Sequence, residues 1–295
     1  MINILKMRKN SFILLTFITV IGLLSSCRKD ELGDSIFDTS SPSRTKFDIW
    51  LLENYTNEYN IEFLYKFSDN ESDRTYNLIP AELEKSKVLA QIVKHVWLEA
   101  YDEVAGIDFT RAYVPKMIHL VGSGAYSGNG TVVLGTAEGG LKVTLYMVND
   151  LKLDINYLNE NYFHVMHHEF AHILHQTKSY DPDFKKITES GYIGNNWIYD
   201  TDPAAQKKGF ISAYAQYEAN EDFVETYSMY VTHDQTWWNS ALANAGSASA
   251  SILIKKIETV RTYFQTKWNI NIDSIRAVIL RRGAEVPTMT YLNLQ

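Results

Sequence analysis

The sequence predicts an α+β fold in which a mixed N-terminal lobe with a small sheet precedes a mainly helical C-terminal lobe. Segments of β-type character, separated by glycine clusters, gather between residues 61 and 148, whereas helical spacing of apolar residues dominates the rest. Apolar residues make up 45% of the 295 positions, with only 6 Pro and 15 Gly. This composition can fill a sizeable core and excludes a disordered chain.

The individual elements follow from periodicity and from their boundaries. Helix-like spacing covers 47–54, and alternation of apolar and polar residues over 61–67 predicts a half-buried strand. A long helix is expected over 81–105, because Pro80 precedes it and Gly106 follows it. Further strands joined by hairpins are expected over 117–121, 131–134 and 141–148, and further helices over 161–177, 220–232, 251–267 and 272–282.

Charge and cysteine content exclude several classes of function. The chain has 28 Lys and Arg against 35 Asp and Glu, and it has no basic run beyond its first ten residues, so we expect no nucleic-acid partner. Cys27 is the single cysteine, which excludes an intrachain disulfide and any multi-cysteine zinc or iron–sulfur site. The glycines over 122–130 match neither the GxGxxG nor the GxxxxGK spacing of phosphate-binding loops, and they predict a flexible hairpin instead. Any metal must therefore be bound through histidines and carboxylates.

The first 26 residues predict a lipoprotein signal peptide. Basic residues precede an apolar run over 12–24, which has the length of a signal-peptide core and is short for a membrane span. The run ends in Leu-Ser-Ser-Cys27, which resembles a lipobox, so we expect cleavage before Cys27 and lipidation of its thiol. An ordinary secretory signal with a coincidental cysteine is the alternative. Residues 27–45, rich in serine, are then a flexible tether, and 46–295 form the functional domain.

The residues after Cys27 bear on localisation. Arg-Lys-Asp-Glu over 28–31 resembles the short export tag of Bacteroidota-type surface lipoproteins. The resemblance implies an outer-membrane protein that is anchored by its lipid and faces the cell surface. Without such a tag, the same anchor would leave the protein facing the periplasm.

An HExxH motif carries the chemistry. Five of the eight histidines lie between positions 164 and 175, and His168, Glu169 and His172 form the motif. On a helix, two histidines four residues apart project from one face, so their imidazoles can bind one ion. Glu169 flanks that face and is free to act as the general base toward a water activated by Zn²⁺, which is the division of labour that metal-assisted hydrolysis needs.

The third ligand must come from elsewhere in the chain. His175 lies too far along the helix axis to share one tetrahedral ion with both motif histidines. Glu221 and Glu225 share a face of the helix expected over 220–232, so one can bind the metal while the other orients a ligand histidine. Asn220 is expected to cap this helix, and acids that merely favour a helix start are the structural alternative. Glu189 is a reserve ligand.

The motifs then resemble a known family. The HEFAH segment, followed by Ser212-x-Tyr214-Ala and by Glu221-Asp-Phe-Val-Glu225, is similar to the gluzincin catalytic domain of the anthrax lethal factor type. The whole chain resembles zinc metallopeptidase lipoproteins associated with outer-membrane nutrient importers. These resemblances imply a zincin-like fold, Glu221 as the third zinc ligand, and Tyr214 as a hydrogen-bond donor to the oxyanion or leaving group. Glu225 stands where gluzincins often carry Asp.

We therefore expect a surface-tethered zinc peptidase acting on peptides or proteins. His164 and His167 are expected to face solvent or to pack beside the motif helix. Two other functions remain open from sequence: a non-catalytic accessory lipoprotein that binds peptide or glycan beside an importer, and a zinc amidase acting on a non-peptide substrate. Retention of Glu169 argues against the first, because a structural metal site has no need of a base.

Overall fold

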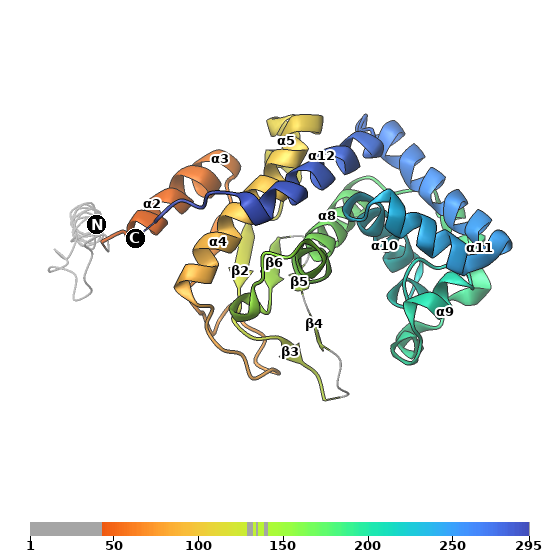
Figure 1. Cartoon of the computed structure of the whole chain (residues 1–295), viewed down its shortest axis with the longest axis horizontal. Helices are drawn as coiled ribbons and strands as arrows, with labels where there is room; N and C mark the ends of the chain where they lie inside the picture. Colours follow the sequence, from red (N-terminus) through yellow and green to blue (C-terminus); the bar gives the residue numbers. More distant parts are fainter. Residues whose placement is uncertain (1–42, 129–131, 134, 139–140, 295) are drawn as a thin grey trace, which may run out of the picture. The chain divides into compact units, whose positions relative to one another are not determined.

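The computed structural model describes residues 43–128, 132–133, 135–138 and 141–294 (Figure 1). The predicted signal peptide, Cys27 and the predicted tether up to residue 42 lie outside the described residues. Arg44–Gln295 form one compact unit. Within the described part, no helix has both the length and the apolar character needed to cross a membrane.

The elements of this unit confirm the α+β class, with helices predominating. The first half of the chain contains α2 (Lys46–Leu51), η1 (Leu52–Thr56), α3 (Asn57–Tyr59), β1 (Glu62–Leu64), α4 (Leu83–Val93), η2 (Lys94–Leu98), α5 (Glu99–Ala105), α6 (Ile107–Tyr113), β2 (Met117–Leu120), β3 (Ala125–Tyr126), β4 (Val132–Val133), β5 (Gly135–Glu138), β6 (Lys142–Leu145) and η3 (Val148–Asp150). The second half contains α7 (Ile155–Leu158), η4 (Asn159–Phe163), α8 (His164–Thr177), η5 (Pro182–Ile187), η6 (Glu189–Gly191), η7 (Gly194–Tyr199), α9 (Asp202–Gln206), η8 (Tyr214–Gln216), α10 (Ala219–Thr232), α11 (Gln235–Tyr263), η9 (Phe264–Trp268), α12 (Ile272–Glu285) and η10 (Val286–Thr288).

The sheet has the strand order β1-β2-β6-β5. β1, β2 and β6 are parallel, and β5 pairs antiparallel with β6. The strand predicted over 117–121 is present as β2, but its predicted place in a hairpin is wrong, because β2 pairs parallel with β1 and β6. The strand beside β6 is β5, not the segment predicted over 131–134, which contains β4. All four residues of β6 are buried, as expected for a strand covered on both faces. A second, two-stranded ladder joins β3 to β4. The sheet is therefore small and ends in β5, which lies beside α8.

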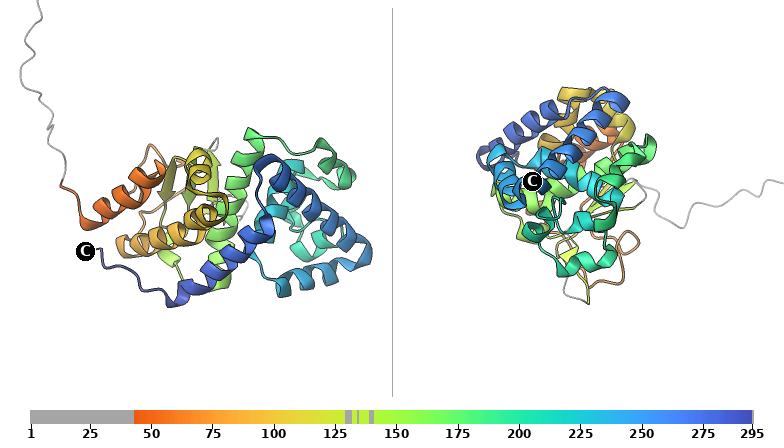
Figure 2. Two further views of the ribbon diagram at one scale, coloured as in Figure 1. Left: turned by 90° about the horizontal axis from the view of Figure 1, so that it is seen from above. Right: turned by 90° about the vertical axis from the view of Figure 1, so that its right-hand side faces the viewer.

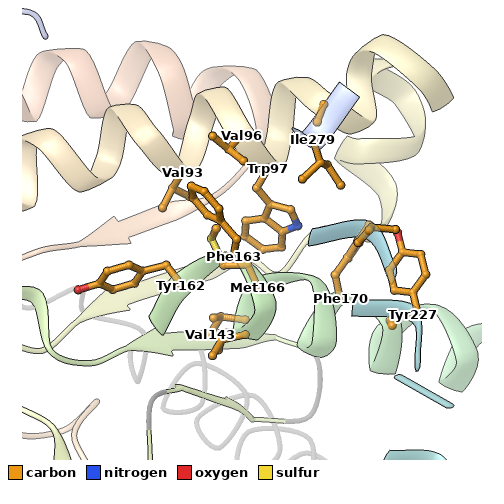
Figure 3. Close-up of a cluster of buried hydrophobic side chains, with 14 of the residues drawn as sticks. Val93, Val96, Trp97, Val143, Tyr162, Phe163, Met166, Phe170, Tyr227 and Ile279 are labelled. Atoms are coloured by element: carbon orange, nitrogen blue, oxygen red, sulfur yellow. The ribbon is translucent and has the colours of Figure 1, made fainter. Parts of the chain in front are cut away.

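One face of α8 packs into the core. Phe170 meets Trp97 of η2 edge-on at 6.0 Å between ring centroids and Tyr101 of α5 at 4.7 Å. Met166 lies in the same cluster, and Val143 of β6 closes it from the sheet side (Figure 3). Because these side chains are fully buried, α8 is fixed between the helices α4 and α5 and the sheet.

The ends of several helices differ from the sequence predictions. Gly106 ends α5 in a positive-φ conformation (φ 86°), as predicted, and α6 follows directly although the sequence analysis did not identify it. α11 begins at Gln235 instead of 251 and is interrupted at Gly246, whose φ is 75°. After α12 the chain returns toward its start along α4, where the Leu292 amide donates to Gln91 Oε1 at 2.8 Å (Figure 2).

A buried ion pair joins α10 to α11. Lys256 Nζ lies 2.6 Å from Asp222 Oδ2, and both side chains are fully buried. The ammonium group also lies 4.0 Å from the centre of the Phe210 ring, and the Tyr192 hydroxyl donates to Asp222 Oδ2 at 2.9 Å. Each charge in this pair is stable in the interior only because the other is present.

We predict that Lys256→Met destabilises the protein by about 3–5 kcal/mol, because it leaves the Asp222 carboxylate buried without its cation. Urea unfolding of the metal-free protein measures this change. The double variant Asp222→Leu/Lys256→Met should recover most of the loss, and Lys255→Met at the exposed neighbouring position should change stability by no more than about 0.5 kcal/mol. A Lys256→Met variant as stable as the wild type would contradict this account.

Candidate metal centre

Four histidines form a row along one face of α8. His164, His168, His172 and His175 follow one another at helical spacing, and neighbouring ring centroids are 5.8, 4.9 and 5.2 Å apart. His167 lies on the opposite, core-facing side, where its Nδ1 is 2.9 Å from the Tyr101 hydroxyl. Burial lowers the pKa of His167 to about 3, so this histidine is a neutral core residue.

The facing helix, α10, supplies the carboxylates. It begins at Ala219, with extended backbone at Glu218, so the expected cap at Asn220 is wrong. Asn220 lies inside the first turn, and its Oδ1 accepts a hydrogen bond of 2.7 Å from the Tyr180 hydroxyl instead of capping the helix. Glu221 and Glu225 lie one turn apart and both point toward the histidine row.

His168, His172 and Glu221 converge at one point. Nε2 of His168 is 3.2 Å from Nε2 of His172, and Glu221 Oε2 is 3.1 and 3.2 Å from these two nitrogens. A tetrahedral zinc ion with N and O ligands at about 2.0–2.1 Å holds its ligand atoms roughly 3.3 Å apart. The three atoms therefore form a triangle that fits such an ion, and the donor set suits zinc.

The electrostatics of the triangle show why it holds together. Burial alone would lower the pKa of His168, but hydrogen bonds to Glu221 and Glu225 outweigh burial and raise it to about 10. Burial alone would raise the pKa of Glu221, yet His168 and His172 lower it to about 2. Glu221 is thus an anion that attracts positive charge to the point where the imidazoles meet.

Glu225 is a hydrogen-bond acceptor at the centre of the site. Its Oε1 lies 2.7 Å from both His168 Nδ1 and His164 Nε2, and its Oε2 accepts a 2.5 Å hydrogen bond from the Ser212 hydroxyl. The carboxylate is almost completely buried, and its contacts with His164 and His168 hold its pKa well below the usual value against the effect of burial. A metal ion that displaces the proton from Nε2 would leave the Nδ1 hydrogen of His168 directed at Glu225 and the Nε2 lone pair directed at the ion. The second group that could bind a metal, His164 with His168 and Glu225, is explained by these hydrogen bonds.

Tyr214 lies beside the triangle on η8. Its ring is 5.9 Å from the His168 ring and meets the Trp197 ring edge-on at 5.0 Å. The Ser212 hydroxyl also accepts a hydrogen bond of 3.1 Å from the Ala215 amide, so Glu225, through Ser212, fixes the turn that carries Tyr214. Burial and the charges of Glu221 and Glu225 raise the pKa of Tyr214, which keeps its hydroxyl protonated.

Glu169 is the neighbour of His168 on α8. Its side chain is partly buried, and burial raises the pKa of its carboxyl group, an effect that His168 and His172 oppose.

Glu189, the reserve ligand, is exposed in η6 and lies in neither of the metal-competent groups found in the described part of the chain. His164 was predicted to face solvent or to pack beside the motif helix. It is instead hydrogen bonded to Glu225.

Two further residues belong to the site. Ser212 has no predicted role of its own, although its position two residues before Tyr214 is a usable signal. His175 is not among the predicted ligands. It instead lies next to His172, with Nε2 3.0 Å from His172 Nδ1.

Comparisons with known proteins support zinc as the metal. Residues 40–273 match the model of a family described as "Putative zinc-binding metallo-peptidase". The crystal structure of a "putative zinc-binding metallo-peptidase" from Bacteroides caccae is similar, with a TM-score of 0.76 and 45% sequence identity, over 88% of this chain and 100% of that one. No curated protein matches the chain. The family model spans well over half of the sequence, and the chain therefore belongs to this family of zinc-binding metallo-peptidases.

Proposed function

We propose that the protein is a zinc peptidase of the gluzincin type with a zincin-like catalytic domain. His168, His172 and Glu221 would hold the ion, Glu169 would be the general base, and Tyr214 would assist the transition state. The observation that carries this proposal is the triangle of ligand atoms 3.1–3.2 Å apart, contributed by two different helices. Membership of a metallo-peptidase family supports the same conclusion.

The chemistry is divided between the ion and the protein. When bound, zinc would polarise the scissile carbonyl and lower the pKa of a water molecule at the site. Glu169 would take the proton from that water and deliver it to the leaving amine. Because burial raises the pKa of Glu169 above its usual value, this carboxylate is a better proton acceptor than an exposed one.

Tyr214 would act on the charge that develops on the substrate. Its raised pKa keeps the hydroxyl protonated at neutral pH, so it can donate a hydrogen bond to the oxyanion or to the leaving group. The turn that carries Tyr214 is tied through Ser212 to the carboxylate that orients His168. The donor and the ligand set are thus positioned by one network.

A peptide substrate is supported by the sheet. β5 is the last strand of the order β1-β2-β6-β5 and lies beside α8. Among the described residues, no strand pairs with its outer edge. An extended peptide can add to such an edge through main-chain hydrogen bonds, next to the helix that carries the histidine row.

The lipobox and export tag support a location. We propose that Cys27 carries the lipid anchor, that the protein is held at the outer membrane facing the cell surface, and that it acts beside a nutrient importer that takes up its products. The tether over 27–45 would then separate the domain from the membrane.

Purified residues 28–295 loaded with zinc should cleave members of a peptide library, and a chelator should abolish cleavage until zinc is restored. Mass spectrometry of the products measures both effects. Glu169→Gln is the matched control: it should keep the zinc, measured by elemental analysis, while the cleavage rate falls by about 10²–10⁴. Cleavage that survives chelation, or ligand binding without turnover in either form, would refute the peptidase.

We predict that Tyr214→Phe lowers kcat by about 10²–10³ with little change in KM, because a hydrogen bond made in the transition state is lost. Steady-state kinetics on a peptide found in the library measures the change. Tyr217→Phe is the control, since this ring stacks on Tyr214 at 6.1 Å and has no proposed role in the reaction. Equal effects of the two variants would show that ring packing, and not the Tyr214 hydroxyl, is responsible.

Cys27→Ser should move the full-length protein from the membrane to the soluble fraction of a Bacteroides host, because the thiol that carries the anchor is absent. Replacement of Lys29, Asp30 and Glu31 by Ala should keep the protein attached to the membrane. It should also make the protein resistant to protease added to whole cells, because the protein would then face the periplasm. Fractionation and immunoblotting measure both. Membrane attachment of Cys27→Ser would contradict the lipoprotein proposal.

A further inference from the structure

We infer that His175 is a positioning residue that orients His172 as a metal ligand. The inference rests on the proposed function, in which His168, His172 and Glu221 hold zinc. It concerns the side of His172 that points away from the proposed ion, to which the HExxH motif assigns no role.

The two ligand imidazoles have the same arrangement of their nitrogens. Each directs Nε2 at Glu221 and turns Nδ1 toward a neighbour on the other side. For His168 that neighbour is Glu225 Oε1 at 2.7 Å, and for His172 it is His175 Nε2 at 3.0 Å. The contact between His172 and His175 is thus the counterpart of the contact between His168 and Glu225.

The tautomers follow from this geometry. His172 can bind an ion through Nε2 only when that nitrogen carries a lone pair, so the ring proton must lie on Nδ1. The Nδ1 hydrogen then donates to His175 Nε2, which must be the unprotonated nitrogen of the His175 ring. Partners of this kind fix both the tautomer and the plane of a ligand imidazole.

His175 is itself held in place by aromatic packing. Its side chain is mostly buried, and its ring lies 5.5 Å from Tyr180 and 6.3 Å from Phe223. Those two rings stack at 4.2 Å, and the Tyr180 hydroxyl donates to Asn220, the residue before Glu221. The cluster that holds His175 therefore also holds the first turn of α10, from which Glu221 projects.

A neutral imidazole is a weaker acceptor than a carboxylate, so His175 should contribute less to zinc affinity than Glu225 does. Loss of an outer partner of a ligand histidine typically weakens metal binding by about 10- to 100-fold. The effect of His175 should lie toward the lower part of that range.

The test measures the zinc dissociation constant of residues 28–295 by competition with a chromogenic chelator. His175→Met keeps the size of the side chain but removes the acceptor, and we expect it to bind zinc about 10-fold more weakly. His175→Gln can place its carbonyl oxygen near the position of Nε2, and we expect affinity within a few-fold of the wild type. His167→Met, the same change at a buried histidine of α8 that contacts Tyr101, should leave zinc affinity unchanged.

A readout on the wild-type protein does not depend on whether a variant folds. In the zinc-loaded protein labelled with ¹⁵N-histidine, NMR should show His172 protonated at Nδ1 and His175 unprotonated at Nε2. A His175 ring protonated at Nε2 would overturn the inference, whereas a His172 ring protonated at Nε2 would contradict the metal centre itself.

The outcomes separate the inference from the proposed function. A wild-type protein that binds no zinc contradicts the metal centre itself. Wild-type binding with His175→Met equally tight, or with His167→Met equally weakened, leaves the metal centre standing and removes the role of His175. Weak binding by His175→Met that His175→Gln restores supports it.

Discussion

The buried carboxylate of Glu225 is the constraint on which the site depends. An ionised carboxylate in the interior is costly unless donors surround it, and here His164, His168 and Ser212 supply them. These donors belong to α8 and to the turn before η8, whereas Glu225 belongs to α10. Satisfying one carboxylate therefore fixes three parts of the chain relative to one another, and the ligand triangle and Tyr214 take their positions from this arrangement.

The two faces of α8 have different roles: one packs in the core, and the other carries the candidate metal ligands. Its core face buries Phe170 against Trp97 and Tyr101, and the apolar contact there stabilises the helix without help from any metal. Its other face carries the histidine row toward α10. Because the core face is tightly packed, the imidazoles are held close to binding geometry before an ion arrives, which is the preorganisation that a catalytic site needs.

Local spacing predicted the parts of the site that lie within one helix. His168 and His172 share a face because they are four residues apart, and the same rule places Glu221 beside Glu225. The sequence could not show that the Asn220 side chain bonds to the Tyr180 hydroxyl instead of capping α10, because Tyr180 lies 40 residues away in the chain. The sequence also could not show that α11 begins as early as Gln235, because the small residues around Gly246 give little apolar periodicity. Nor can spacing along one helix show the contact between His175 and His172, because that contact depends on the orientation of both rings.

Anomalous diffraction at the zinc edge, from crystals of the zinc-loaded protein, tests the central claim most directly. The account predicts one strong peak about 2.0–2.1 Å from Nε2 of His168, Nε2 of His172 and a carboxylate oxygen of Glu221. A peak bound elsewhere, or a peak at the two histidines with Glu221 turned away from it, would contradict the account.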